Sequence, residues 1–212
     1  MGTWRRLTTR LHGHPSELGA PVPSPNLRGS LALQQLVPVL AEAHHPAVLD
    51  LGCVWQATVA FFTGMGCKVY TEDFFSPLSR AVEETSAEAP PLSQRFLPGL
   101  LHYPDQHFRS VLAWDLFDYL PDELVEPLAA RLYALLQPGG ALLVLFHQRR
   151  EDGPFLRYRV LDGHTLELLP GSLPLRLRRT YAHRALLNLF AAFRSSRTFV
   201  GRDNLRELFL LK

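Results

Sequence analysis

The sequence has few cysteines and no hydrophobic run long enough to span a membrane. Its two cysteines, Cys53 and Cys67, are predicted to be buried, and neither has a neighbouring Cys or His at a spacing typical of zinc sites. Apolar runs such as 142–146 fall far short of the ~20 residues of a spanning helix. No apolar segment follows the N-terminal arginines, so no secretory signal is predicted. We therefore expect a cytoplasmic protein without a membrane span or a metal site.

Glycine and proline are not enriched either. With 14 Gly and 17 Pro among 212 residues, collagen-like and mostly disordered chains are excluded. A hydrophobic content of 47% is enough for one sizeable core. Residues 1–28 hold prolines and no apolar periodicity, so we expect an N-terminal arm or linker there, followed by a single domain over 29–212.

The charge is divided unevenly along the chain. Residues 1–148 contain 9 Lys and Arg against 14 Asp and Glu, whereas 149–212 contain 13 against 6, nearly all of the basic ones being Arg. Two interpretations stay open for the C-terminal excess. It forms an ordinary solvated surface, or it forms a cationic face for an anionic substrate, a nucleic acid or an acidic partner.

Strand-like and helix-like segments alternate along the chain. Short apolar runs predict strands, and apolar residues three or four apart predict helices. The expected strands are 46–51, 67–72, 108–114, 140–146 and 205–211, and the expected helices are 31–43, 56–65, 77–88, 122–137 and 181–193. This alternation predicts a doubly wound, mostly parallel α/β sheet. Asp162-Gly163, within 155–169, predicts a β-hairpin.

Three segments carry a resemblance to a known family. The sequence VLDLGC at 48–53, the pair Glu72-Asp73 and LLQPGGALLVLF at 135–146 resemble the class I S-adenosylmethionine-dependent methyltransferases, over roughly residues 30–147. The resemblance implies a Rossmann-like sheet of seven strands, and the hairpin predicted from Asp162-Gly163 is expected as an insertion in its C-terminal part. It also implies S-adenosylmethionine as cofactor and an unidentified methyl acceptor. The glycine-poor first loop and the ending RDNLRE at 202–207 are similar to bacterial methyltransferase-like proteins of unassigned activity.

The same resemblance implies a set of cofactor-binding residues. Asp50 and Gly52 correspond to the acidic residue and the first glycine of the family's first motif, and Cys53 follows them. Asp73, with Glu72 as the runner-up, corresponds to the carboxylate that holds the ribose hydroxyls, and Trp114 ends the fourth-strand region. A carboxylate at a strand end can accept two hydroxyls, and a glycine lets backbone approach a ligand. The other interpretation of Asp73 is a cap of the following helix.

The first loop departs from the family pattern. Val54 and Gln56 stand where the family has its second and third glycines, with Trp55 between them. Two interpretations stay open: these side chains project into the cofactor space, or the loop is rebuilt around an altered pose. We therefore expect a methyltransferase whose activity is intact, reduced or lost, depending on which interpretation of the loop holds. The alternative is a non-catalytic binding or assembly protein that uses its Arg-rich C-terminal surface.

Candidates for handling the methyl acceptor follow the next two strands. Asp115, Asp118 and Tyr119 come after the predicted strand at 108–114, and His147 comes after the one at 140–146. Any of them could orient or deprotonate an acceptor, because ligands bind at the carboxyl ends of parallel strands. The other interpretation of the two aspartates is that they cap the following turn or helix.

Overall fold

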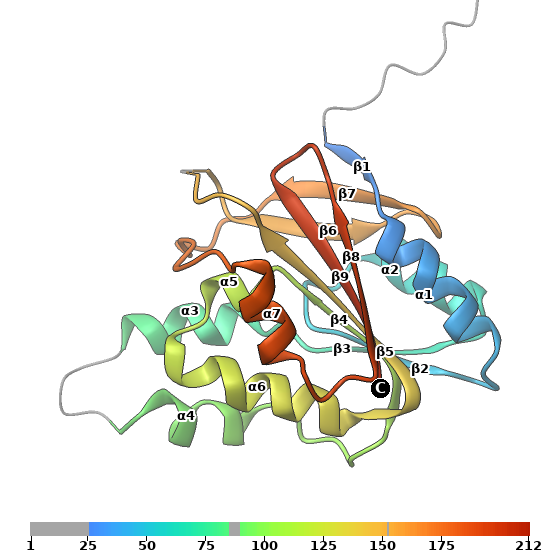
Figure 1. Cartoon of the computed structure of the whole chain (residues 1–212), viewed down its shortest axis with the longest axis horizontal. Coiled ribbons are helices and arrows are strands. Elements are labelled where there is room, and N and C mark those ends of the chain that lie inside the picture. Colours follow the sequence, from blue (N-terminus) through green and yellow to red (C-terminus); the bar gives the residue numbers. More distant parts are fainter. Residues whose placement is uncertain (1–25, 85–89, 152) are drawn as a thin grey trace, which may run out of the picture.

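The computed structural model describes residues 26–84, 90–151 and 153–212, and its centre is a six-stranded sheet (Figure 1). The strands are β2 (Ala47–Asp50), β3 (Lys68–Thr71), β4 (Phe108–Trp114), β5 (Leu136–His147), β8 (Ser195–Val200) and β9 (Leu205–Leu211). Their order is β3-β2-β4-β5-β9-β8. The first four strands are parallel, and β9 is antiparallel to both β5 and β8. The predicted doubly wound, mostly parallel sheet is present.

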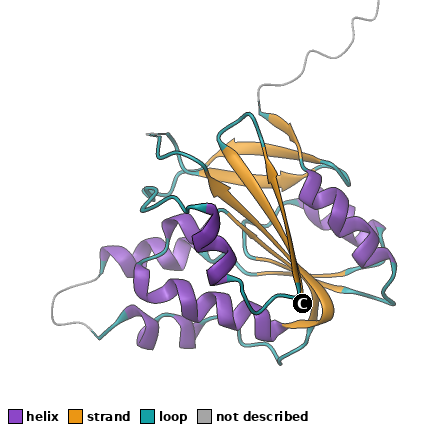
Figure 2. Ribbon diagram, in the orientation of Figure 1, coloured by secondary structure: helices purple, strands orange, loops and turns teal. Residues whose placement is uncertain are grey.

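Helices cover both faces of this sheet (Figure 2). One face carries α1 (Leu31–Ala41) and α2 (Gln56–Gly64). The other carries α3 (Phe75–Glu83), α4 (Leu92–Arg95), α6 (Asp122–Leu135) and α7 (His183–Leu189), with the short α5 (Leu116–Tyr119) following β4. The central strands β2, β4 and β5 are largely apolar on both faces because each face is covered: Val48 packs in the core beside α1, and its neighbour Leu49 packs in the core beside α6.

A second, smaller sheet lies across the carboxyl ends of the parallel strands (Figure 1). It contains β1 (Leu27–Gly29), β6 (Leu156–Val160) and β7 (Thr165–Pro170) in the order β1-β7-β6, all antiparallel. The pairing of β6 with β7 confirms the hairpin predicted from Asp162-Gly163. Tyr158 and Val160 of β6 pack in the same core as α1 and α2, so the small sheet is fixed to the large one.

The number of strands was predicted wrongly. The large sheet has six strands among the described residues, against seven expected. After α3 the chain forms α4 and a 3-10 helix over Leu97–Gly99 instead of a further edge strand, which leaves β3 at the edge. Pro98 and Gly99 disfavour a strand here, because proline lacks a ladder donor and glycine weakens strand pairing. In addition, β8 was not anticipated, because SSRTFV lacks a buried apolar face.

Parts of two predictions lie outside the described residues. These are residues 1–25 of the expected arm and residues 85–88 of the expected helix at 77–88. Within the described part, Leu27–Gly29 form β1 and are paired with β7. No helix among the described residues is long and apolar enough to cross a membrane.

Candidate functional site

The end of β2 and the end of β4 meet at the centre of the carboxyl edge. Trp114 Nε1 donates a 2.7 Å hydrogen bond to Asp50 Oδ1, and the Gly52 amide donates to the same oxygen at 2.9 Å. A Cβ atom added to Gly52 would lie 2.6 Å from Trp114 Nε1, so the indole rests directly on this glycine. Burial raises the pKa of Asp50 to about 6, although the two hydrogen bonds favour its charged form. The Gly52 position therefore tolerates no side chain.

The small sheet holds Trp114 in this position. Its indole stacks on the ring of Tyr158, with ring centroids 5.3 Å apart and the planes 8° from parallel. Tyr158 in turn donates a 2.9 Å hydrogen bond to Asp115 Oδ2. Trp114 is only 1% exposed, and its φ of 48° is a left-handed conformation that is unfavourable for a bulky residue. The backbone at the end of β4 is thus strained where it delivers the indole to Gly52.

The substituted residues of the first loop are not among the nearest neighbours of the Gly52 Cβ position, which are atoms of Trp114 and Asp50. Val54 is 64% exposed, and Gln56 is exposed at the start of α2. Neither is among the described residues with positive φ, and Trp55 is extended. The guanidinium of Arg159 lies 5.3 Å from the centroid of the Trp55 ring. Trp114, and neither Val54 nor Gln56, is the side chain that lies against Gly52.

Asp73 and Glu72 both make internal contacts at the end of β3. Asp73 Oδ1 accepts hydrogen bonds from the amides of Phe75 and Ser76, and its Oδ2 accepts one from the Ser76 hydroxyl at 2.5 Å. Asp73 therefore caps α3, in line with the alternative interpretation. Glu72 accepts a 2.9 Å hydrogen bond from the Leu101 amide, which ties the segment after the 3-10 helix to β3.

Cys53 lies near charged residues, and one of them, Arg157, was not predicted from the sequence to be close to it. Burial raises the pKa of its thiol, Arg157 of β6 opposes that shift, and the carboxylates of Asp73 and Asp50 add to it. Arg157 is half-buried, and its Nε is buried without a hydrogen-bond partner. Among the described residues Arg157 also has no ion pair. A single guanidinium is thus left free beside the first loop.

A second group of polar residues lies where β4 and β5 end. Asp118 Oδ2 accepts two hydrogen bonds from His147, one from the backbone amide at 2.7 Å and one involving ring Nδ1 at 3.0 Å. Asp115 Oδ2 lies 3.9 Å from the same ring nitrogen. Both carboxylates are fully buried, whereas the His147 side chain is 11% exposed. The structure therefore brings together Asp115, Asp118 and His147, three of the four predicted acceptor-side candidates.

Burial and mutual repulsion set the protonation of this group. Burial raises the pKa of Asp115 to about 7, with Asp118 adding to the shift. Burial also raises the pKa of Asp118, against the opposing effect of His147. For His147, burial lowers the pKa, but the Asp118 hydrogen bond and the charges of Asp115, Asp118 and Glu151 outweigh it, so the pKa is raised. Tyr119, the fourth candidate, has a raised pKa because it is buried near both aspartates.

Two cavities lie on the acceptor side of this edge. One has a volume of about 410 Å³, the other about 810 Å³, and both are lined by Tyr119, Arg150 and the segment 175–177. His147 lines the larger one. Of the segments that hold most of the predicted site residues, 50–56, 72–74 and 113–119, only Tyr119 lines either cavity. The hollow part of the edge is therefore displaced from β2 and β3 toward β5 and β9.

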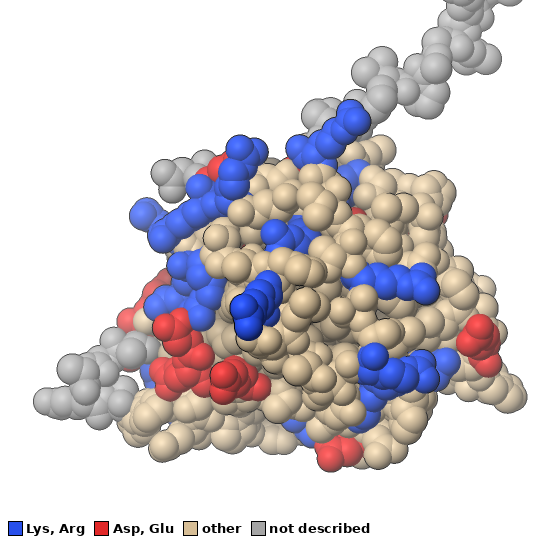
Figure 3. All heavy atoms as spheres, in the orientation of Figure 1, with Lys and Arg blue, Asp and Glu red and all other residues tan. Residues whose placement is uncertain are grey.

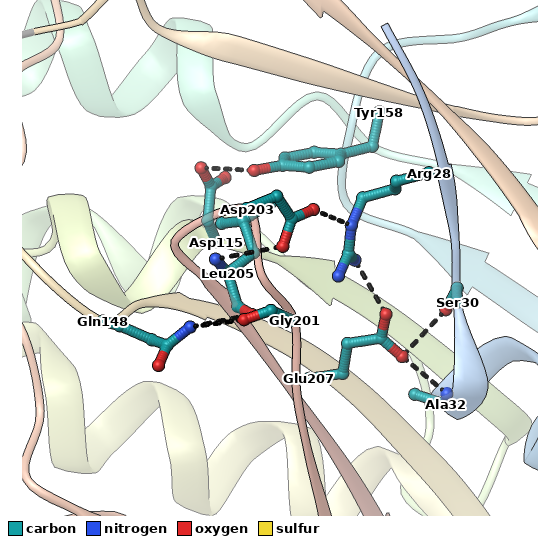
Figure 4. A network of polar contacts seen from close by, with 10 residues as sticks. All are labelled: Arg28, Ser30, Ala32, Asp115, Gln148, Tyr158, Gly201, Asp203, Leu205 and Glu207. Carbon is teal, nitrogen blue, oxygen red and sulfur yellow. Dashed lines mark hydrogen bonds and ion pairs between the residues drawn. The ribbon is translucent and has the colours of Figure 1, made fainter. Parts of the chain in front are cut away.

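The RDNLRE segment lines part of the larger cavity. Its carboxylates also connect β9 to β1 and to the start of α1 (Figure 4). Arg28 of β1 lies between Asp203 and Glu207, with nitrogen to oxygen distances of 2.6 and 2.7 Å. Glu207 Oε2 also accepts hydrogen bonds from Ser30 Oγ and from the Ala32 amide at the start of α1. This network fixes β1 and α1 to β9.

Some of these residues were missed from the sequence. Arg157 and Arg28 lie outside the family motifs, and a count of charge along the chain does not distinguish them from solvated arginines. Glu207 belongs to the RDNLRE ending, but its partners were missed. One signal was available for Arg157: in LRYRV the strand alternation places Arg157 and Arg159 on one face and Tyr158 on the other. Within the described residues, no group of three or more His, Cys, Asp or Glu side chains could hold a metal ion.

Comparison with known proteins identifies the fold. Neither a protein-family model nor a curated protein sequence matches the chain. Among solved structures, an S-adenosylmethionine-dependent methyltransferase from Archaeoglobus fulgidus superposes with a TM-score of 0.52 at 11% identity, covering 85% of this chain and 91% of that one. A second such enzyme, from Mesorhizobium loti, has a TM-score of 0.48 at 15% identity, with coverages of 84% and 96%.

A third similar structure contains ligands. It is the 1,6-didemethyltoxoflavin-N1-methyltransferase of Burkholderia thailandensis with bound 1,6-didemethyltoxoflavin and S-adenosylhomocysteine, at a TM-score of 0.46 and 19% identity, covering 86% of this chain and 78% of that one. At these identities the likeness concerns architecture. The chain has the class I S-adenosylmethionine-dependent methyltransferase fold.

Proposed function

We propose that the protein is an S-adenosylmethionine-dependent methyltransferase that binds its cofactor at the ends of β2 and β3 and its acceptor beside His147. The observation that carries the proposal is the pair of charges on either side of the first loop. Asp73 is a half-buried carboxylate at the end of β3. Arg157, beside Cys53, has no ion pair within the described part of the chain, and its buried Nε has no hydrogen-bond partner there. We also place the protein in the cytoplasm, where its free thiols at Cys53 and Cys67 would stay reduced.

The polar residues at this edge fit the polar ends of the cofactor. Asp73 Oδ2 accepts a single hydrogen bond, from Ser76, so it has capacity for a ribose hydroxyl. Arg157 offers a fork of N–H donors that matches the methionine carboxylate. In this arrangement Asp73 serves both as the helix cap and as the ribose ligand.

The cofactor can approach Gly52 at the centre of this edge only if the Trp114 side chain moves. Its indole rests on Gly52, where a backbone approach to the cofactor would otherwise be free. The strained φ of Trp114 and the irregular pairing of β4 with β5 between Leu112 and Trp114 identify this strand end as the place where a rotation would relieve strain. We therefore include displacement of the Trp114 indole from Gly52 in the proposal.

On the acceptor side, His147 is the candidate general base. Asp118 engages Nδ1, which leaves Nε2 to take the proton of an acceptor in the cavity that His147 lines. Asp115 and Tyr158 position the end of β4 through their 2.9 Å hydrogen bond. When bound, S-adenosylmethionine supplies an electrophilic methyl group on sulfur, so the protein needs to supply mainly alignment and proton removal.

Calorimetric titration with S-adenosylhomocysteine tests the proposal. We expect saturable one-site binding to the wild type and about tenfold weaker binding to Asp73→Asn, because a charge-assisted hydrogen bond is worth roughly 1.5–3 kcal/mol. Asp162→Asn is the matched control, since Asp162 lies at the tip of the β6–β7 hairpin and bonds only to its neighbours. Trp114→Ala should bind more tightly than the wild type, because the indole no longer competes for the space over Gly52.

Two results would contradict the proposal. If neither wild type nor Trp114→Ala binds the ligand, the alternative of a non-catalytic binding or assembly protein with an Arg-rich contact surface takes its place. If Asp73→Asn and Asp162→Asn bind equally well, Asp73 acts only as the cap of α3.

A further inference from the structure

The cavities on the acceptor side carry a pattern of charge that the proposed function does not use. Both are lined by Tyr119, Arg150, Leu175, Arg176 and Leu177, so they adjoin along the same segment. The smaller cavity is also lined by Arg178 and Glu83. Figure 3 shows basic side chains gathered on the side of the molecule where the β5–β6 connection lies. The hollow therefore opens on an arginine-rich part of the surface.

The carboxylates at the rim do not neutralise these arginines. In the wall of the larger cavity, Asp203 is paired with Arg28 at 2.6 Å, and Glu151 faces Arg149 at 3.7 Å. Arg150 and Arg176 have neither an ion pair nor a side-chain hydrogen bond among the described residues. Their charges remain available to a ligand in the cavity that both of them line.

Leucines line much of the rest of the wall, together with Pro154 and the polar Asn204. Five leucines contribute to it, namely Leu156, Leu168, Leu175, Leu177 and Leu205. His147 provides a ring nitrogen that Asp118 does not engage, and Tyr119 provides a phenol. A volume of about 810 Å³ lies within the 300–1,000 Å³ typical of small-molecule sites. Apolar walls with a few polar groups are likewise typical of such sites, rather than of a flat macromolecular interface.

From these observations we infer that the larger cavity binds a small hydrophobic anion, an aromatic or aliphatic scaffold that carries a carboxylate, sulfonate or phosphate, with the anionic group at Arg150 and Arg176. The leucines contact the scaffold, and His147 faces its remaining polar group. Resting on the proposed function, this ligand is the methyl acceptor, and its nucleophilic atom lies at His147. The excess of arginine in the C-terminal part of the chain then serves, at these two positions, to select a small anionic ligand.

A matched pair of fluorescent probes tests this inference in the full chain. 8-Anilinonaphthalene-1-sulfonate carries a sulfonate on an aromatic scaffold, and N-phenyl-1-naphthylamine has the same rings without the charge. We expect the wild type to bind the sulfonate about tenfold more tightly than the neutral probe. That preference corresponds to about 1.4 kcal/mol.

Substitutions locate the effect. In Arg150→Gln/Arg176→Gln the preference for the sulfonate should disappear, while the affinity for the neutral probe stays as in the wild type. Arg184→Gln is the control, because Arg184 is exposed on α7 and lines neither of the two cavities. Equal affinities of the wild type for the two probes would overturn the inference. So would an unchanged preference in the double variant, or a loss of preference in Arg184→Gln.

This experiment fails independently of the proposed function, since it contains no S-adenosylmethionine. If the probes behave as expected but S-adenosylhomocysteine does not bind, the cavity is an anion site of a non-catalytic protein. If S-adenosylhomocysteine binds but the arginines have no effect on the probes, the methyltransferase proposal stands and the inference about its acceptor is refuted.

Discussion

Trp114 and Asp50 join the ends of two parallel strands by a single buried hydrogen bond of 2.7 Å. The bond positions the indole on Gly52, and the same Asp50 oxygen holds the Gly52 amide. Each residue compensates a cost of the other: Trp114 supplies a donor to a buried carboxylate, and Asp50 anchors a tryptophan with a φ of 48°. The displacement of the indole proposed above would therefore break this contact.

Gly52→Ala should destabilise the protein by about 1–3 kcal/mol, because the new methyl group would overlap the indole. Its Cβ would lie 2.6 Å from Trp114 Nε1 and 2.9 Å from Trp114 Cδ1. Gly64→Ala is the control, since nothing lies within 4 Å of its Cβ position at the end of α2. Urea denaturation measures both. Equal stability of the two variants would contradict this prediction, because it would mean that the indole moves aside with no loss of stability.

Asp50→Asn should remove a pH dependence of stability. Burial raises the pKa of Asp50 from 3.8 to about 6, so the folded state resists ionisation that the unfolded chain accepts. The resulting penalty is absent below pH 3.8, grows between that value and about pH 6, and is full above it, reaching about 3 kcal/mol. Unfolding free energies at pH 5 and pH 8 should therefore differ less for the variant. An identical pH profile of the two proteins would contradict this account.

Asp118→Asn should lower the pKa of His147. The substitution keeps an oxygen for the His147 amide but removes the negative charge that favours the protonated ring. Asp115 and Glu151 also act on this ring and stay in place. An NMR titration of the histidine Cε1–H signals measures the change. Asp162→Asn, which removes the partner of His164, should leave the pKa of His147 unchanged. If the pKa of His147 is the same in both variants, Asp118 does not control the protonation of His147.

Glu207→Ala should cost about 3–5 kcal/mol of stability, because it leaves a buried guanidinium with one partner fewer. Glu207 binds Arg28, Ser30 and the Ala32 amide, and only 3% of its side chain is exposed. Asp203→Ala removes the other partner of Arg28. The Asp203 side chain is 39% exposed, so this substitution should cost about 1 kcal/mol or less. Guanidinium denaturation compares the two. The reverse order would show that the rim contact, and not the buried one, holds β1.

The sequence predicted the layers of the fold better than the contents of its edge. Continuous apolar runs such as 111–114 and 141–146 are buried on both faces and could be assigned to strands directly. The strand at 195–200 could not, because its residues are half-buried or exposed and it is paired only with β9. The seventh strand of the family pattern is missing from the described residues because Pro98 and Gly99 disfavour a strand where the family has one.

For the site, the sequence identified residues but not their partners. Asp115, Asp118 and His147 were anticipated from strand ends, because parallel strands end at one edge. The indole over Gly52 was not, since it depends on a positive φ at the end of β4 and on a ring stack with Tyr158 from a distant hairpin. The first loop lacks two glycines of the family pattern, yet the Val54 side chain that replaces one of them is exposed to solvent.

A crystal structure of the protein with S-adenosylhomocysteine tests the central claim most directly. We predict the ribose hydroxyls within hydrogen-bond distance of Asp73, the ligand carboxylate at Arg157, and the Trp114 indole displaced from Gly52 with its bond to Asp50 broken. A structure in which Trp114 still rests on Gly52 and the ligand lies away from Asp73 would contradict the claim.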